Sequence, residues 1–349
     1  MRVLIVDDDE IALELLSETL IGSGYEVEVA RNGREALEIL RTGLYRMVIS
    51  DWEMPEMDGI ELCRRIRERH LSSYVYIILV TARDRTEHIV EGLNAGADDF
   101  ISKPFQPAEL CVRLRTGLRL LSLESRNVTI FSLAKLAESR SPETGAHLER
   151  IREYCRIIAQ ELSDDDRYRD TIDADYVHLI YLTSPLHDIG KVGIPDSVLL
   201  KPGPLTDKEF EIMKSHVLIA AETLDAAIRI QPDAEFLRMA RDIALTHHER
   251  FDGSGYPHGL VAEQIPLCGR IVALADVYDA LTARRVYKNA LTHDVAKSII
   301  LEGNGVHFDP DIVEAFLRRE DEFMTIQQRF ADSEFNDSLT GMLALGAEV

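Results

Sequence analysis

The stretch His247-His248-Glu249-Arg250-Phe251-Asp252-Gly253-Ser254-Gly255-Tyr256-Pro257 joins two adjacent histidines to a turn of small and polar residues. Neutral imidazole is the commonest protein ligand for transition metals. The turn residues tolerate unusual backbone angles and present backbone N–H groups to an anion. Upstream, the segment Leu186-His187-Asp188-Ile189-Gly190-Lys191 again combines metal-ligating residues with glycine. Together the two segments predict a metal centre of more than one ion that handles phosphate.

The size and composition of the chain limit what the protein can be. Its 349 residues predict about two domains, and no segment has the ~20 apolar residues that a membrane helix needs. No signal peptide is recognisable after Met1, so we expect a cytoplasmic protein without a membrane partner. The formal net charge of −22 argues against binding DNA or other long nucleic acids through their phosphates. A small anionic substrate is compatible with this charge where metals or a local basic patch offset it.

Short apolar strands alternate with helical patterns through the first third of the chain. The predicted strands are Val3–Val6, Glu26–Ala30, Met47–Ser50, Tyr76–Val80 and Phe100–Ser102. The predicted helices between them are Ile11–Leu20, Glu35–Arg41, Ile60–Arg69 and Glu87–Asn94. This alternation indicates an α/β domain with a five-stranded, doubly wound parallel sheet of the flavodoxin-like kind.

Acidic residues stand at the carboxyl ends of these strands, where such sheets bind their ligands. Asp7 and Asp8 follow the first strand and Asp51 follows the third. Three converging carboxylates repel one another unless a hard cation such as Mg²⁺ lies among them. Thr81 after the fourth strand and Lys103 after the fifth suit the oxygens of a phosphoryl group. The predicted chemistry is transfer of a phosphoryl group to one aspartate acting as nucleophile.

Residues 1–120 resemble the receiver domain of two-component response regulators. The resemblance rests on Val6-Asp7-Asp8, Asp51-Trp52-Glu53-Met54-Pro55, Thr81-Ala82 and Lys103-Pro104-Phe105. It implies phosphorylation of Asp51 by a cognate sensor histidine kinase. The other roles that it implies are Mg²⁺ binding by Asp8, Asp51 and the Glu53 carbonyl, assistance by Asp7, phosphoryl contacts by Thr81 and Lys103, and switching by Phe100. A receiver that folds without being phosphorylated is the alternative.

A helical connector is predicted at 107–140. Pro107 suits the first turn of a helix, and apolar residues then recur at spacings of three and four. They are Leu110, Leu114, Leu118 and Leu121. A helix of these 34 residues would reach on the order of 50 Å. The segment resembles a signalling helix that pairs between two subunits, so we expect a homodimer. The alternative is a kinked or broken helix packed on its own chain, with Gly117 as the break.

The pattern from 125 to 320 is almost wholly helical and predicts an all-α domain. The clearest helical stretches are Leu148–Leu162, Tyr176–Leu186, Asp207–Ala227 and Ala234–Thr246. Ligand-type residues recur along the domain, namely His147, His187, Asp188, His216, His247, His248 and Asp276. Ser141-Pro142 is typical of a helix start. Glu143 and His147 would then lie four apart on one helix face, a spacing at which two side chains can share a ligand.

These segments resemble the HD-GYP domain, a subgroup of the HD metal-dependent phosphohydrolases. The matching pieces are Glu143-Thr144-Gly145-Ala146-His147, Leu186-His187-Asp188-Ile189-Gly190-Lys191, His247-His248-Glu249, Gly255-Tyr256-Pro257 and Gly305-Val306-His307-Phe308-Asp309-Pro310. A receiver followed by this domain is the architecture of RpfG-type regulators, and it implies hydrolysis of cyclic di-GMP to pGpG or GMP. One departure is Val286, which stands in the substrate-contacting loop where the family usually has proline.

The reaction can also be derived from the residues. Ions in a cage of histidines and carboxylates lower the pKa of bound water from about 15.7 to roughly 7, which provides hydroxide for in-line attack on phosphorus. Asp188 is the expected bridge between two ions. His187 and Asp276 are expected on one side of the bridge, and His216, His247 and His248 on the other. Lys191 is expected to stabilise negative charge on the phosphoryl oxygens.

The number and identity of the ions are partly constrained. Iron or manganese fits the mixed nitrogen and oxygen ligands, and zinc stays open. Glu143 together with His147 predicts a third ion, and the alternative is that Glu143 only accepts a hydrogen bond from His147. The residues expected to contact the dinucleotide are Lys191, Arg285, Lys288 and Tyr256.

Two other functions fit the same residues. The substrate could be another cyclic dinucleotide, because no residue that reads guanine is identifiable. The domain could instead be a non-catalytic nucleotide sensor or an adaptor for diguanylate cyclase domains, since the resemblance implies such contacts for the Gly-Tyr-Pro loop. The filled ligand set favours catalysis over both binding roles. Residues 321–349 match no recognisable pattern, and their role stays open.

Overall fold

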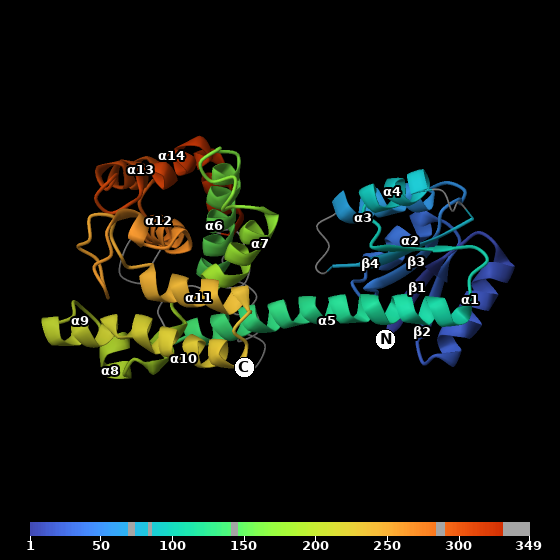
Figure 1. The fold of residues 1–349 in the computed structure, drawn as a ribbon, viewed down its shortest axis with the longest axis horizontal. Helices are drawn as coiled ribbons and strands as arrows, with labels where there is room; N and C mark the ends of the chain where they lie inside the picture. The colour runs from blue at the N-terminus through green and yellow to red at the C-terminus, as the bar shows by residue number, and fades with distance from the viewer. Residues whose placement is uncertain (69–73, 83–85, 141–145, 284–289, 331–349) are drawn as a thin grey trace, which may run out of the picture. The chain divides into compact units, whose positions relative to one another are not determined.

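A parallel sheet of five short strands forms the first part of the chain. The computed structural model describes residues 1–68, 74–82, 86–140, 146–283 and 290–330. The strands are β1 (Arg2–Val6), β2 (Glu26–Ala30), β3 (Met47–Asp51), β4 (Tyr76–Thr81) and β5 (Asp99–Ser102). Their order is β2-β1-β3-β4-β5, which confirms the predicted doubly wound sheet (Figure 1). Because Val6 pairs with Ser50, the carboxylates of Asp7 and Asp51 emerge at the same edge of the sheet.

Helices cover both faces of this sheet. They are α1 (Glu10–Gly22), α2 (Gly33–Leu40), α3 (Gly59–Glu68), α4 (Thr86–Asn94) and α5 (Pro107–Glu138). In β1, Val3 and Ile5 belong to a buried cluster with residues of α1 and α5, whereas Leu4 and Val6 pack with residues of α2 and α3. This alternation with a period of two is expected for a strand that is buried on both faces.

The helix α5 spans 32 residues, and Figure 1 shows it without a break. The chain divides into two compact units, Met1–Val128 and Thr129–Val349, so α5 begins in the first unit and ends in the second. Gly117 does not break the helix. A Cβ atom at Gly117 would lie 2.5 Å from the ring of Tyr76, so the glycine lets α5 pack closely against β4.

Helices dominate the described part of the second unit, which confirms the predicted all-α domain. They are α6 (His147–Ser163), α7 (Ala174–Thr183), η1 (Ser184–Leu186), η2 (Ile189–Gly193), α8 (Asp196–Leu199), α9 (Asp207–Lys214), α10 (His216–Ile230), α11 (Glu235–Thr246), η3 (Ala262–Gln264), α12 (Leu267–Thr282), α13 (His293–Glu302) and α14 (Pro310–Arg318). The core lies between α6 and α12, where Ile151, Tyr154, Ile271 and Tyr278 are fully buried.

Two of the predicted helices are divided in the structure. The stretch predicted as Asp207–Ala227 is interrupted at Ser215, whose hydroxyl donates to the Ile212 carbonyl oxygen at 2.6 Å and so competes with helix continuation. The stretch predicted as Tyr176–Leu186 ends as an α-helix at Thr183, and Pro185 lies in the short helix η1 that follows. A ligand-type histidine directly follows each of these irregular segments.

The second unit extends past the boundary predicted at residue 320. Residues 320–330 are helical, and the fully buried ring of Phe323 stacks on Tyr154 with centroids 4.4 Å apart. Gln327 Nε2 donates to the Thr282 carbonyl oxygen at 2.9 Å. Residues 320–330 therefore pack with the second unit, and the domain boundary at residue 320 stays a prediction. The sequence itself indicates an amphipathic helix here, because Phe323, Ile326 and Phe330 recur at spacings of three and four.

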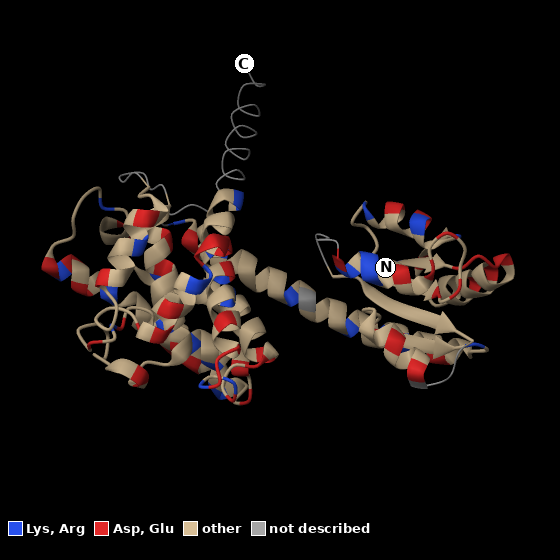
Figure 2. Cartoon of the chain, turned by 90° about the horizontal axis from the view of Figure 1, so that it is seen from above, with Lys and Arg blue, Asp and Glu red and all other residues tan. Residues whose placement is uncertain are grey.

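Several predicted features fall outside the described residues. They are the helix start at Ser141-Pro142, the residues Glu143, Arg285, Val286 and Lys288, and the segment 331–349. Within the described ranges, no helix is both long and apolar enough to cross a membrane. Figure 2 shows aspartate and glutamate distributed over the helices of both units, in keeping with the net charge of −22.

Gly190 determines how closely η2 approaches α10. A Cβ atom at Gly190 would lie 1.9 Å from the His216 carbonyl oxygen and 2.9 Å from the Ala220 nitrogen. Since backbone atoms cannot swing aside, we expect Gly190→Ala to lower the free energy of unfolding by about 1–3 kcal/mol. Gly193→Ala is the matched control in the same helix, because its Cβ would meet only side-chain atoms of Ile219, the nearest at 3.0 Å. Thermal unfolding compares the variants, and equal melting temperatures would contradict this interpretation.

Candidate metal centre

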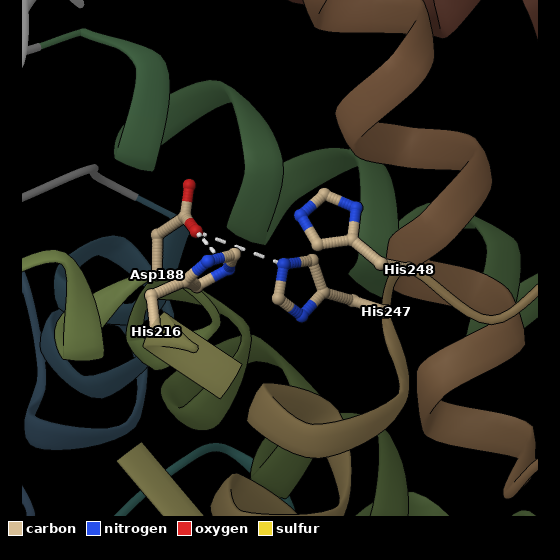
Figure 3. A group of neighbouring side chains, drawn as sticks. All are labelled: Asp188, His216, His247 and His248. Atoms are coloured by element: carbon tan, nitrogen blue, oxygen red, sulfur yellow. Dashed lines mark ion pairs between the residues drawn. The ribbon is translucent and has the colours of Figure 1, made fainter. Parts of the chain in front are cut away.

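Asp188 and three histidines, from three separate parts of the chain, converge in the second unit (Figure 3). Asp188 lies between η1 and η2, His216 begins α10, and His247 and His248 follow α11. Oδ1 of Asp188 lies 3.1 Å from Nε2 of His216 and 3.7 Å from Nε2 of His247. Each of the four residues offers one ligand atom, and these atoms all lie within 4.8 Å of one another. The structure thus brings together the residues that were expected to share one side of the bridge.

His147, His187 and Asp276 form a second group of ligand atoms within 4.8 Å of one another. Oδ1 of Asp276, from the middle of α12, lies 3.9 Å from Nε2 of His147 and 4.0 Å from Nε2 of His187. The second carboxylate oxygen of Asp188, Oδ2, lies 3.4 Å from Nε2 of His187. One oxygen of Asp188 therefore faces each group, which is the arrangement that a bridging carboxylate requires.

Hydrogen-bond acceptors fix the tautomer of four of these histidines. In three of them, Nδ1 lies near the carbonyl oxygen of a residue three or four positions earlier. The distance is 2.9 Å in His187, 2.7 Å in His216 and 3.1 Å in His247. A carbonyl oxygen can only accept, so Nδ1 donates its proton and, in the neutral ring, Nε2 presents a lone pair. In His147, the carboxylate of Asp279 accepts from Nδ1 at 2.7 Å. Metal-ligating histidines are oriented in this way by partners on their other ring nitrogen.

The buried ligand atoms fit a divalent ion. Four of these atoms make no hydrogen bond to any part of the chain that the structure describes. They are Nε2 of His187, His216 and His247 and Oδ1 of Asp188. Two ligands about 2.1 Å from one ion lie roughly 3.0–3.4 Å apart in octahedral or tetrahedral geometry. The Asp188 oxygens lie 3.1, 3.4 and 3.7 Å from the Nε2 atoms of His216, His187 and His247, which is close to this spacing. None of these contacts has the alignment of a hydrogen bond.

The charges of the two groups also favour a cation. Burial opposes ionisation of Asp188, but Lys191 and His187 outweigh it and hold the pKa of this carboxyl well below its usual range. Burial likewise opposes a charged His187, but Asp188 raises the pKa of that imidazole to about 10. Burial lowers the pKa of His247. Burial also lowers the pKa of His248, and the neighbouring His247 imidazole lowers it further. A metal ion would displace the His187 proton and take over its role as counter-charge.

Two residues that the sequence analysis missed hold His147 in place. Asp279 is 1% exposed and accepts from Nδ1 of His147 and, at 2.6 Å, from Nε of Arg150. Burial opposes an ionised Asp279, but His147 and Arg150 lower the pKa of this carboxyl to about 2. The available signal was spacing, because Asp279 follows Asp276 and Arg150 follows His147 by one helical turn.

The Gly-Tyr-Pro loop is fixed beside the histidines by Glu249. This buried carboxylate accepts from the backbone N–H groups of His258 at 2.8 Å and Leu260 at 3.1 Å. The ring centroid of Tyr256 lies 4.8 Å from that of His248. Tyr256, which was expected to contact substrate, therefore stands at the edge of the metal-ligand groups.

The remaining predicted residues divide into those placed at the site and those outside the described ranges. Nζ of Lys191 lies 2.5 Å from Oδ2 of Asp188, beside the expected bridge. Glu143, Arg285 and Lys288 lie outside the described residues. A further residue that the sequence analysis missed is Glu138, a buried carboxylate whose Oε1 lies 3.5 Å from Nε2 of His147.

A separate acidic group lies at the carboxyl edge of the sheet in the first unit. Asp7, Asp8 and Asp51 offer oxygens within 4.8 Å of one another. Nζ of Lys103 lies 3.0 Å from Oδ2 of Asp7 and 2.9 Å from Oδ1 of Asp51. Burial raises the pKa of Asp51, and Thr81 is buried at the end of β4. These positions agree with those that the receiver resemblance implies.

Two further receiver predictions concern residues at the rim of this group. Glu53 is exposed just after β3. Phe100 lies in β5, half-buried, and the guanidinium of Arg113 stands 5.8 Å from the centroid of its ring. Their expected roles, a Mg²⁺-binding carbonyl and a switch aromatic, stay predictions.

Comparisons with known proteins match both parts of the chain. Residues 3–115 match the family described as response regulator receiver domain, and residues 132–312 match the family described as HD domain. A probable cyclic di-GMP phosphodiesterase of Vibrio cholerae is 41% identical over 95% of this chain and 80% of that protein. A cyclic di-GMP phosphodiesterase of Thermotoga maritima is 37% identical over 96% of this chain and 94% of that protein. The cyclic di-GMP phosphodiesterase response regulator RpfG of Xanthomonas campestris is 38% identical over 91% of this chain and 87% of that protein.

These matches confirm both resemblances seen in the sequence. The HD domain is a divalent-metal-binding domain, and the two groups of histidine and aspartate ligands lie within the residues that match it. The acidic group with Lys103 lies within or beside the strands that match the receiver. The chain therefore belongs to the family of response-regulator cyclic di-GMP phosphodiesterases, in which a receiver domain precedes an HD domain.

Proposed function

We propose that this chain hydrolyses cyclic di-GMP to pGpG or GMP at the metal centre of the second unit, under control of phosphorylation at Asp51. The observation that carries the proposal is the Asp188 carboxylate, whose two oxygens face separate groups of ligand-type residues. Two ions on either side of one carboxylate form a clamp suited to in-line displacement at phosphorus. The names of relatives that align over nearly the whole chain support the choice of substrate.

Each residue has a defined part in this proposal. Ions bound here would supply hydroxide near neutral pH and neutralise charge on the phosphoryl oxygens. The side chains that hold them are His147, His187 and Asp276 on one side of Asp188, and His216, His247 and His248 on the other. Lys191 adds positive charge beside the bridge, where the phosphoryl oxygens become more negative. Tyr256 offers an aromatic face to a nucleobase, and Arg285 and Lys288 hold the phosphates.

The proposed metals are two or three ions of iron or manganese. Mixed imidazole and carboxylate ligands suit both metals. Glu143 with His147 is proposed to hold the third ion. In the first unit, Asp8, Asp51 and the Glu53 carbonyl are proposed to hold Mg²⁺, with Asp7 assisting and Thr81 and Lys103 at the phosphoryl group.

A second candidate substrate is the related cyclic dinucleotide 3′3′-cGAMP. A 3′3′-cGAMP-specific phosphodiesterase of Vibrio cholerae is 39% identical, over 66% of this chain and 40% of that protein. Cyclic di-GMP is favoured because the relatives that also share the receiver carry that substrate in their names. Turnover of both dinucleotides by the same preparation distinguishes the two.

The proposed partners are a cognate sensor histidine kinase, a second copy of this chain and diguanylate cyclase domains. The connector α5 exposes several large apolar side chains, namely Val112, Leu120, Leu123, Leu133 and Leu136. Exposed apolar side chains on a long helix favour pairing with another helix. They support a homodimer through α5, and the half-buried Gly-Tyr-Pro loop is the proposed contact for diguanylate cyclase domains.

Replacement of the bridging carboxylate is expected to remove turnover. Asp188→Ala deletes the oxygens that face both ligand groups, so hydrolysis of cyclic di-GMP by protein supplied with Mn²⁺ should fall to background. Product formation is measured by chromatography, with Asp233→Ala as the control because Asp233 is exposed. Turnover at the wild-type rate in Asp188→Ala would refute the assignment of the site.

Loss of the carboxylate behind His147 is expected to weaken metal binding. Asp279→Asn removes the charged acceptor of the Nδ1 proton and leaves Arg150 without its buried counter-charge. We expect Mn²⁺ affinity to fall by roughly 10–100-fold and the melting temperature to drop. Asp233→Asn makes the same chemical change at an exposed position. Unchanged metal affinity in Asp279→Asn would show that His147 needs no such support.

Phosphorylation of the receiver is expected to change the rate of hydrolysis. The motivating observations are the acidic group around Asp51 and the unbroken helix that begins in one unit and ends in the other. A coupling of about 1–3 kcal/mol corresponds to roughly 5–150-fold. Rates are compared with and without beryllofluoride, using Asp51→Asn as the control that cannot respond. Identical rates and identical oligomeric state in all four samples would mean that the receiver is not a switch.

A further inference from the structure

Glu138 is the last residue of the connector helix α5, and its side chain is buried in the second unit. The residue is 7% exposed, and Oε1 lies 3.5 Å from Nε2 of His147. The carboxylate also lies near enough to His187 to favour the charged form of that imidazole. The connector thus delivers a carboxylate to the ligand group formed by His147, His187 and Asp276.

The ring nitrogen of His147 that Glu138 faces is Nε2. Nδ1 of His147 is committed to Asp279, and Nε2 lies 3.5 Å from Oε1 of Glu138 and 3.9 Å from Oδ1 of Asp276. Two buried carboxylates beside one imidazole need positive charge among them, which an imidazolium proton or a metal ion can supply. Ligands of one ion are spaced at about 3.0–3.4 Å, close to the separation between Glu138 and His147.

The position of Glu138 on its helix favours a cation nearby. The C-terminal end of a helix carries partial negative charge, which attracts positive charge. Glu138 lies in the last turn of α5 and is 7% exposed, so solvent screens its charge little. A divalent ion beside His147 would interact favourably with both the carboxylate and the helix end.

We propose that Glu138 is a ligand of the ion held by His147 and Asp276, and that it ties the connector helix to the metal centre. This inference rests on the proposed metal-dependent function and adds a residue to it. Its consequence is that a shift of the end of α5 moves a metal ligand. Binding linkage is reciprocal, so phosphorylation of the receiver should change metal affinity, and metal binding should change the response of the receiver.

The test measures metal binding, not activity, in the full chain. Metal-depleted wild type, Glu138→Gln and Glu138→Asp are titrated with MnCl₂, bound metal is counted by elemental analysis, and melting temperatures are recorded with and without Mn²⁺. Glu222→Gln is the matched control, because Glu222 is exposed on α10. We expect a loss of affinity at one site of roughly 10–100-fold in Glu138→Gln, an intermediate loss in Glu138→Asp, and none in the control.

The outcomes separate this inference from the proposed function. Wild-type affinity and ion count in Glu138→Gln would overturn the role of Glu138 while leaving the metal centre intact. Affinity in Glu138→Gln equal to or above that in Glu138→Asp would also overturn it, because it would indicate a hydrogen-bonding role that needs no charge. No Mn²⁺ binding by the wild type would overturn the proposed function itself. Should Glu138→Gln fail to fold, wild-type affinity in Glu138→Asp is the overturning result.

Discussion

The carboxylate of Asp188 faces two groups of imidazoles at once, and the second unit is arranged around that requirement. Oδ1 is directed to His216 and His247, and Oδ2 to His187. A buried carboxylate is costly unless positive charge surrounds it. Lys191 supplies one such charge at 2.5 Å, and the lone pairs of the surrounding imidazoles point inward as a metal site requires. The need for cations at this position explains why so many polar side chains are buried together in a helical domain.

The ends of helices make this arrangement possible. His147 and His216 begin their helices, and His187 and His247 immediately follow theirs. At three of these ends, a carbonyl oxygen three or four residues earlier accepts from Nδ1. Two of these carbonyl oxygens, those of Ser184 and Ile243, also accept from the backbone N–H of the same histidine, at 3.2 and 3.0 Å. The breaks at Ser215 and Pro185 therefore serve the site, because each places a histidine where the backbone can fix its tautomer.

Much of the architecture could be predicted from local sequence. Strands β1, β3 and β4 carry continuous apolar runs, and several candidate metal ligands stand in short segments with glycine. The divided helices could not be predicted in this way, because nothing in the apolar period distinguishes Ser215 from an ordinary helical serine. Asp279, Arg150 and Glu138 were missed for a different reason. Charged residues on amphipathic helices are normally solvated, and only tertiary packing shows that these three are buried beside His147.

Asp188 is proposed to bridge two ions held by the Nε2 atoms of the surrounding histidines. Anomalous diffraction at the manganese absorption edge, from crystals of the full chain grown with MnCl₂, tests this claim directly. We expect one peak beside each oxygen of Asp188, at about 2.0–2.2 Å from Nε2 of His216 and of His187. A single peak on one side of Asp188, or coordination through Nδ1, would contradict it.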